Sequence, residues 1–114
     1  MIHIINQTLC GIVFKCSSCN KIHIEFNNFN LNLPEPEYCL FVQYINDLDG
    51  DYWAEKNKGS VCQRKIRIPI ASKAVCLMLH PNELSELRQL LVLPDEPIIE
   101  KTLANKLQEC VCWN

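Results

Sequence analysis

The sequence predicts an α+β fold in which two tandem β-β-α units share a mainly antiparallel sheet with helices on one face. The first observation is a repeat, because residues 21–48 and residues 64–92 carry nearly the same order of apolar and polar positions. In each copy, two runs of alternating apolar residues flank a short turn, and a stretch that begins with proline and glutamate follows. One unit would leave half of its apolar sheet face uncovered, so we expect both units to pack into one domain, residues 1–114.

The first unit begins with a predicted β-hairpin. Apolar residues alternate with polar ones at 22–26 and again at 29–33. The Asn27-Asn28 pair between these runs suits a two-residue turn, because asparagine tolerates positive φ. Helical spacing of apolar residues over 35–48 then predicts an amphipathic helix whose apolar side packs on the sheet. The hairpin register pairs the polar residues of the outer face, His23 with Asn32 and Glu25 with Asn30.

The second unit repeats this plan. Its predicted strands lie at 66–70 and 75–79, and its helix begins at Pro81. Pro69 has no amide hydrogen to donate, so the first of these strands is expected either at the edge of a sheet or with its outward position unpaired.

The segments outside the two units are also assigned. Apolar alternation at 2–5 and 9–14 predicts an N-terminal hairpin that extends the sheet. Residues 46–60 contain two glycines and no clear periodicity, and they read as the longest irregular stretch. A break at two prolines and a new helical spacing predict a C-terminal helix at 96–112.

Composition narrows the class of protein. The chain has 114 residues, of which 48% are hydrophobic, and a formal charge of -2, so a globular core is expected and a general attraction to nucleic acid is not. No apolar run approaches the ~20 residues that a membrane span needs. We therefore expect a cytoplasmic protein whose eight cysteines are thiols or metal ligands rather than disulfides.

The best chemical clue is the Cys16-Ser-Ser-Cys19 motif. Its two-residue spacing is typical of a zinc knuckle, in which a tight turn brings both sulfurs to one point. A closed structural zinc site has four ligands, and the chain has no second motif of this kind. Zinc is thus the one cofactor indicated, held by Cys16 and Cys19 with further ligands open. The candidates for completion are Cys10 and His23, and then Cys62, His80, Cys110 and Cys112.

The sequence leaves two alternative functions open. A thiol-redox or metal-handling protein would use Cys16 and Cys19 directly, although Cys19 leads into a strand and not into the helix start that lowers a thiol pKa. A weak single-stranded nucleic-acid binder would use Lys65 and Arg67 with the aromatic pair at 52–53. The net negative charge of the chain disfavours this function.

The leading prediction is a non-enzymatic intracellular binding or structural module. No glycine-rich phosphate loop or nucleophile elbow occurs in the sequence, and no catalytic residue is assigned. Its contact surface for an unknown protein partner or for self-association would be the sheet face opposite the helices. The residues expected on that face are His23, Glu25, Asn30, Asn32, Lys65, Arg67, Cys76 and Met78.

The residues also resemble a known type of protein. The run FKCSSCNKIHIEFNNFNLNL, the proline-glutamate helix that follows it, and the later RKIRIPI and NELSELRQLL segments resemble a family of small uncharacterised Bacteroidetes proteins. The resemblance covers most of residues 14–91. It implies no activity and no catalytic residues, and it supports only the Cys-x-x-Cys motif before the hairpin as a metal or structural element.

Overall fold

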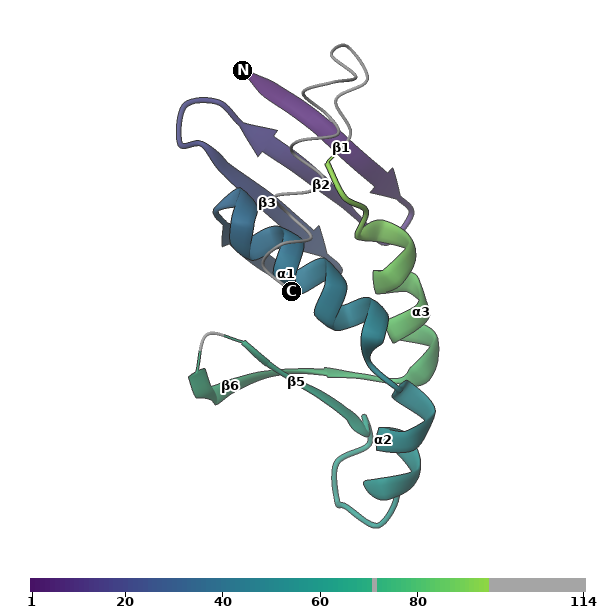
Figure 1. The fold of residues 1–114 in the computed structure, drawn as a ribbon. Helices are drawn as coiled ribbons and strands as arrows, with labels where there is room; N and C mark the ends of the chain where they lie inside the picture. Colours follow the sequence, from purple (N-terminus) through teal and green to yellow (C-terminus); the bar gives the residue numbers. More distant parts are fainter. Residues whose placement is uncertain (71, 95–114) are drawn as a thin grey trace.

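The computed structural model describes residues 1–70 and 72–94, and these form an α+β structure with two antiparallel sheets and three helices (Figure 1). None of these helices is long and apolar enough to cross a membrane. In chain order the elements are β1 (Ile2–Thr8), β2 (Gly11–Cys16), β3 (Lys21–Phe26), β4 (Phe29–Leu33), α1 (Glu35–Asp47), α2 (Gly50–Lys56), β5 (Ile66–Ile70), β6 (Ser72–Leu79) and α3 (Pro81–Leu90).

The first sheet is an antiparallel meander in the order β1-β2-β3-β4. The predicted hairpin is confirmed, since Phe26 pairs with Phe29 across the Asn-Asn turn and Asn27 has a φ of 53°. Its register is also the predicted one, with His23 opposite Asn32 and Glu25 opposite Asn30. The N-terminal hairpin exists too, but its first strand is longer than expected, its second strand begins two residues later, and its turn lies at 9–10.

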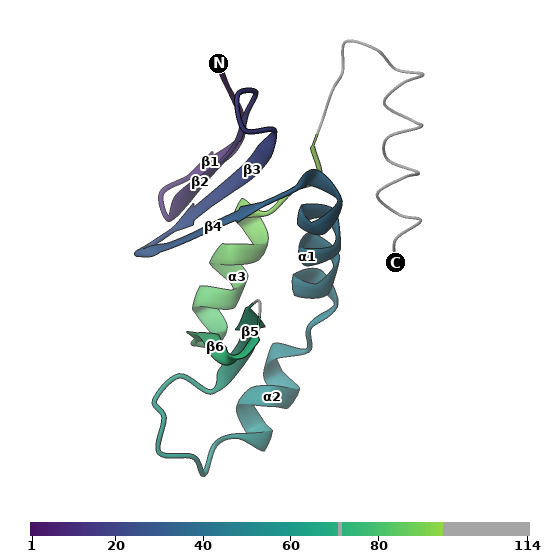
Figure 2. The ribbon, with the colours of Figure 1, turned by 90° about the vertical axis from the view of Figure 1, so that its left-hand side faces the viewer.

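Helices α1 and α3 cover one face of this sheet (Figure 2). The apolar positions of β3 point toward them, so Ile22 and Ile24 are fully buried. On α1 the buried residues are spaced as a helix requires, and on α3 the leucines at 84, 87 and 90 do the same. Tyr38 anchors the chain after α3, because its hydroxyl donates a hydrogen bond to the carbonyl of Val92.

The prediction of one shared sheet is wrong. Each half of the chain does run strand, strand, helix, but β5 and β6 form a separate two-stranded sheet at the other end of the helices (Figure 1). There β5 contacts α2 and β6 contacts α3, and neither strand pairs with β4. Ile66 and Ile68 nevertheless join the same hydrophobic cluster as Ile24, so the two sheets share a core without sharing hydrogen bonds.

The physical reason for this arrangement is α2, which the sequence reading placed in an irregular stretch. Asp49 starts this helix by accepting a hydrogen bond from the amide of Tyr52, at 3.0 Å. The helix follows α1 after two residues and carries the chain away from the first sheet before β5 begins. The predicted C-terminal helix at 96–112 lies outside the described residues.

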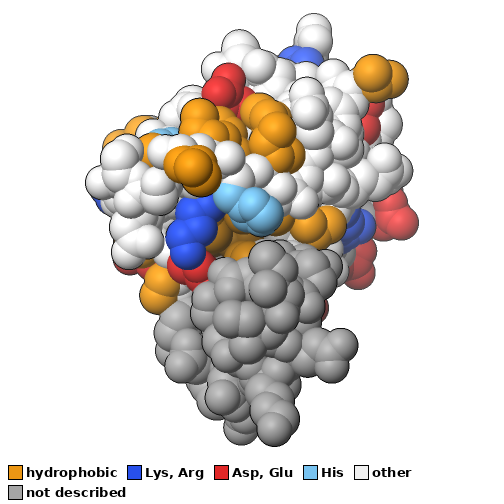
Figure 3. Space-filling view, turned by 90° about the horizontal axis from the view of Figure 1, so that it is seen from above, with side chains coloured by type: hydrophobic (Ala, Val, Ile, Leu, Met, Phe, Trp, Pro, Cys, Tyr) orange, Lys and Arg blue, Asp and Glu red, His pale blue; other side chains and the backbone are white. Residues whose placement is uncertain are grey.

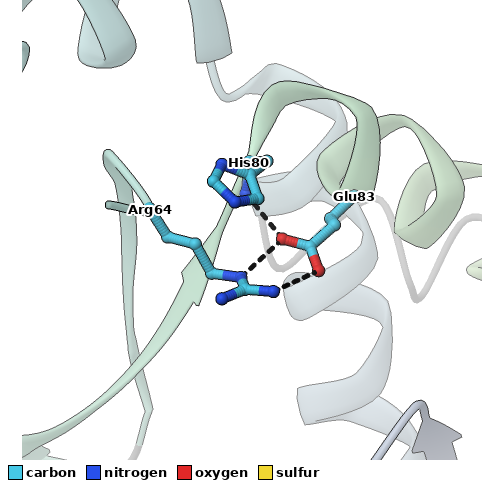
Figure 4. Close-up of polar contacts among 3 residues, drawn as sticks. All are labelled: Arg64, His80 and Glu83. Carbon is cyan, nitrogen blue, oxygen red and sulfur yellow. Dashed lines mark hydrogen bonds and ion pairs between the residues drawn. The ribbon is translucent and has the colours of Figure 1, made fainter. Parts of the chain in front are cut away.

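The start of α3 is held by an ion pair (Figure 4). Glu83 accepts a hydrogen bond from the amide of His80 at 2.8 Å, which caps the helix, and it accepts two more from the guanidinium of Arg64. The hydrogen bond from Arg64 is the main reason that the pKa of Glu83 lies below its usual range. The contact ties the segment before β5 to the helix after β6.

Gly11 gives a test of the packing between β2 and its neighbours. A Cβ at this position would lie 1.9 Å from the carbonyl oxygen of Glu25 and 3.1 Å from Leu90 Cδ2, so the backbone would have to move. We expect Gly11→Ala to lower the free energy of unfolding by about 1–3 kcal/mol, measured by urea denaturation. Gly59→Ala is the matched control, because nothing lies within 4 Å of its added Cβ. Equal effects of the two substitutions would contradict the close approach at Gly11.

Candidate metal centre

The turn between β2 and β3 brings two cysteines together. Cys16 is the last residue of β2, and the chain returns as β3 at Lys21. The amide of Asn20 donates a hydrogen bond to the carbonyl of Cys16 at 2.8 Å, which closes the turn. Asn20 adopts a φ of 56°, a left-handed conformation that asparagine tolerates better than most residues. A backbone hydrogen bond and the left-handed Asn20 thus close the reversal that brings the two cysteines together.

His23 joins the two cysteines from the adjoining strand. The nitrogen and sulfur atoms of Cys16, Cys19 and His23 all lie within 4.8 Å of one another. Within this group, Cys19 Sγ and His23 Nε2 lie 3.2 Å apart. Around a tetrahedral zinc ion the same atoms would be separated by ~3.5–3.8 Å, given the usual Zn–S and Zn–N bond lengths. Small rotations of the cysteine side chains therefore suffice to bring this group onto one ion.

Two neighbours fix the orientation of the imidazole ring. His23 Nδ1 lies 2.5 Å from Asn32 Oδ1, and because an amide oxygen only accepts hydrogen bonds, Nδ1 carries the proton. The lone pair of the neutral ring is then on Nε2, the nitrogen that faces Cys19. The ring of Phe14 stacks on the imidazole with a centroid distance of 4.8 Å and an interplanar angle of 16°. The ring is thus held in the tautomer and plane that a metal ligand needs.

The electrostatics of the turn favour a thiolate at Cys16. A hydrogen bond with the Ser18 hydroxyl, 2.9 Å away, is the largest cause that lowers the pKa of the Cys16 thiol to about 6. Contacts with the amide and thiol of Cys19 and with the amide of Ser18 act in the same direction, and desolvation opposes them. Near neutral pH, Cys16 is therefore mostly in the anionic form that binds metals and attacks electrophiles.

The other sequence candidates lie elsewhere. Cys10 is at the opposite end of β2, about 20 Å along the strand from Cys16, where burial and Glu86 raise the pKa of its thiol. Cys62 lies in the segment before β5 and His80 at the start of α3, while Cys110 and Cys112 are outside the described residues. Within residues 1–70 and 72–94, the metal-ligating group consists of two sulfurs and one nitrogen.

The oxidation state of the cysteines agrees only in part with the expectation from the sequence. Five of them, at 10, 16, 19, 62 and 76, are free thiols. Cys39 is disulfide-bonded, so the expectation that every cysteine is a thiol or a metal ligand is wrong at this position.

The contact surface expected from the sequence is divided between the two sheets. His23, Glu25, Asn30 and Asn32 do share the outer face of the first sheet, but Arg67, Cys76 and Met78 belong to β5 and β6. Lys65 precedes β5, and its ammonium group donates a hydrogen bond to the carbonyl of Ser60 at 2.7 Å. Lys56 lies over both aromatic rings of the 52–53 pair. The basic and aromatic residues considered for nucleic-acid binding thus do not form one surface with the metal-ligating group.

The sequence did not predict three residues of the site, which are Phe14, Ser18 and Asn32. The hairpin register already placed Asn32 opposite His23, so the signal for its role was present once His23 was considered a ligand. Phe14 pairs with His23 across β2 and β3, a pairing that depends on the tight turn at the cysteines.

Comparison with known proteins gives a family without an activity. A family model described as a family of unknown function, DUF6686, matches residues 1–109. No curated protein and no solved structure matches the chain. The predicted resemblance to a family of unknown function is thereby confirmed. The match says nothing of the organisms in which that family occurs.

The thiolate at Cys16 predicts a particular pattern of alkylation. In the presence of a chelator, the rate at which Cys16 reacts with iodoacetamide should rise with pH and reach half of its maximum near about pH 6, because the thiolate is the reacting species. Ser18→Ala should move this midpoint to higher pH, since the largest stabilising hydrogen bond is lost. Peptide mapping by mass spectrometry after brief labelling at a series of pH values measures both.

Ser17→Ala is the matched control for this experiment, because the Ser17 hydroxyl donates to the carbonyl of Met1 and not to Cys16. A midpoint near the ordinary thiol value of 9.0, or a profile that Ser18→Ala leaves unchanged, would contradict the electrostatic account of the turn.

Proposed function

The chain belongs to the DUF6686 family of unknown function, and we propose that it is a non-enzymatic binding module that holds one zinc ion through Cys16, Cys19 and His23. The observation that carries the proposal is the convergence of three ligand atoms, with Asn32 leaving the lone pair of His23 on the nitrogen that faces Cys19. Two thiolates and an imidazole form a soft donor set, which suits zinc better than magnesium or calcium.

The proposed ion would not be the element that folds the chain. The turn is already closed by a backbone hydrogen bond, and β2 and β3 pair along their whole length. The hydrophobic core lies on the opposite face of the sheet, where Val13 and Ile24 are fully buried. Zinc fingers without such a core unfold when the metal is removed, whereas here the loss of metal would change only the turn and its surface.

The accessibility of the site supports exchange or sharing of the ion. Cys19 is exposed, while Cys16 and His23 are half-buried. Three protein ligands leave one tetrahedral position for water or for a group from another molecule. Such a site suits reversible binding, which requires that Cys16 and Cys19 stay reduced, and both are free thiols.

A thiol-redox role is the second candidate, and the depressed pKa of Cys16 favours it. The Cys16 thiolate would attack one sulfur of a substrate disulfide and release the other as a thiolate, which leaves a mixed disulfide. Cys19 would then attack Cys16 Sγ of this mixed disulfide and release the second substrate thiol, so a disulfide between Cys16 and Cys19 remains and the substrate is reduced. The two functions differ in their need for His23. Binding of zinc uses His23 as a ligand, whereas disulfide exchange between the two cysteines proceeds without it.

Metal titration of the full chain tests the proposed function. With reductant present, the protein should bind about one Zn²⁺ or Co²⁺ per chain, and the Co²⁺ form should show thiolate charge-transfer absorption and the visible bands of a tetrahedral ion. Cys16→Ser, Cys19→Ser and His23→Gln should each weaken binding by at least about 100-fold, since each removes one of three ligands. Cys62→Ser is the matched control and should bind as the unaltered chain does, because its thiol lies outside the group. If His23→Gln binds normally while thiol-disulfide exchange is fast, the redox role replaces the zinc role.

The role of Asn32 is tested separately. Asn32→Ala frees Nδ1 of His23, so the other tautomer becomes available and the affinity for Zn²⁺ should fall by about 10–100-fold. Asn30→Ala is the control, since Asn30 lies on the same face of β4 but pairs with Glu25 instead. Isothermal titration of both variants gives the comparison. Equal affinities would show that the contact with Asn32 does not orient the ligand.

A further inference from the structure

The face of the first sheet that points away from α1 and α3 carries no other element of the described chain (Figure 2). We call it the open face. Antiparallel pairing arranges its side chains in three rows that run across the strands. The first row, toward the cysteine turn, holds Ile2, Cys16 and Lys21. The central row holds Ile4, Phe14, His23 and Asn32. The third row holds Gln7, Ile12, Glu25 and Asn30.

The open face is apolar on one side and polar on the other. Its β1 and β2 side exposes 62% of Ile2 and 52% of Ile4 to solvent, unusually high values for isoleucine. Viewed from the end that carries the N-terminus, hydrophobic side chains lie beside histidine and basic side chains (Figure 3). The polar side holds His23, so the apolar strip borders the candidate metal centre directly, through the stacking of Phe14 on His23.

We propose that a second copy of this chain packs its open face against the first, about a two-fold axis that runs along the central row. The zinc ion held by Cys16, Cys19 and His23 then takes its fourth ligand from the partner's Glu25. The inference rests on the proposed function, because the partner's Glu25 can be a fourth ligand only if Cys16, Cys19 and His23 hold an ion. Two such ions, one from each copy, would lie in the interface.

The charges of the face select this axis. On β3, Lys21 and Glu25 stand on either side of the central row, both exposed. Rotation about the central row places Lys21 of each copy opposite the partner's Glu25, so two pairs of opposite charge form. An axis parallel to the strands between β2 and β3 would instead press Glu25 onto the partner's Ile12 and leave the carboxylate without a cation.

The same rotation brings a carboxylate to the metal. Lys21 pairs with Cys16 across the strands and lies two residues from both Cys19 and His23. A partner side chain opposite Lys21 therefore lies above the open position of the ion. Packed sheets are about 10 Å apart, a distance that a glutamate from one sheet and a cysteine-bound ion on the other can span together. Glutamate oxygen is an ordinary fourth ligand for zinc.

The size of the apolar strip makes the association depend on metal. Two half-exposed isoleucines and their neighbours offer on the order of 300 Å² of apolar surface per copy, whereas a stable interface buries about 800 Å² per partner, of which somewhat more than half, about 450 Å², is apolar. The apolar contact alone is thus too small for a lasting dimer. Coordination by the partner's Glu25 supplies the missing affinity, so the chain should be a monomer without zinc and a dimer with it.

Sedimentation of the full chain with and without one equivalent of Zn²⁺ tests this inference. We expect a mass near 13.2 kDa in chelator and about twice that mass with zinc. Glu25→Gln should remain monomeric with zinc while still binding about one ion per chain, because its own three ligands are intact. Ile4→Glu should do the same, since both copies carry the change and two carboxylates then face each other across the two-fold axis. Val75→Glu is the matched control for Ile4→Glu, because Val75 is a 56% exposed apolar residue on β6, outside the open face, and this variant should still dimerise.

Each alternative outcome separates the two proposals. A chain that binds zinc and stays monomeric overturns the dimer and leaves the proposed function standing. A dimer that persists in chelator, or that survives both Glu25→Gln and Ile4→Glu, uses another surface and also overturns the inference. A chain that binds no zinc overturns the proposed function, and the inference with it. Circular dichroism confirms that Glu25→Gln, a conservative change at an exposed position, is folded.

Discussion

Burial of alternate residues along β3 is the constraint on which the candidate site depends. Ile22, Ile24 and Phe26 are removed from water against α1 and α3, and each such side chain contributes roughly 1.5–3 kcal/mol. Because side chains of a strand alternate between faces, this burial forces His23 and Glu25 onto the open face. A shift of one residue in register would exchange the two sets and move the histidine away from the cysteines. The hydrophobic core therefore positions the polar site without contacting it.

Much of the local structure follows from the sequence alone. The Asn27-Asn28 turn specified the hairpin and its register, which was enough to pair His23 with Asn32. The separation of the sheets did not follow, because the repeat describes each unit and says nothing of how strands from different units pair. That choice was made by α2, a short helix whose Asp49 cap stood within a stretch that lacked apolar periodicity. Helices of two turns leave too few periodic positions to be recognised by pattern.

For the candidate site, spacing found the two cysteines but could not choose among the further ligands. Cys10 and His23 are both near the motif in sequence, and only the direction of β2 distinguishes them. A strand carries Cys10 away from the turn, whereas the return strand brings His23 back beside it. The orienting contacts of Asn32 and Phe14 come from two different strands, so they appear only once the pairings on both sides of β3 are known.

X-ray absorption at the zinc edge of the zinc-loaded chain tests the central claim, that Cys16, Cys19 and His23 hold one ion, most directly. The account predicts a first shell of two sulfur atoms at about 2.3 Å and two nitrogen or oxygen atoms at about 2.0–2.2 Å, with the outer-shell scattering of one imidazole ring. A shell of nitrogen and oxygen alone, four sulfur atoms, or no imidazole contribution would contradict it.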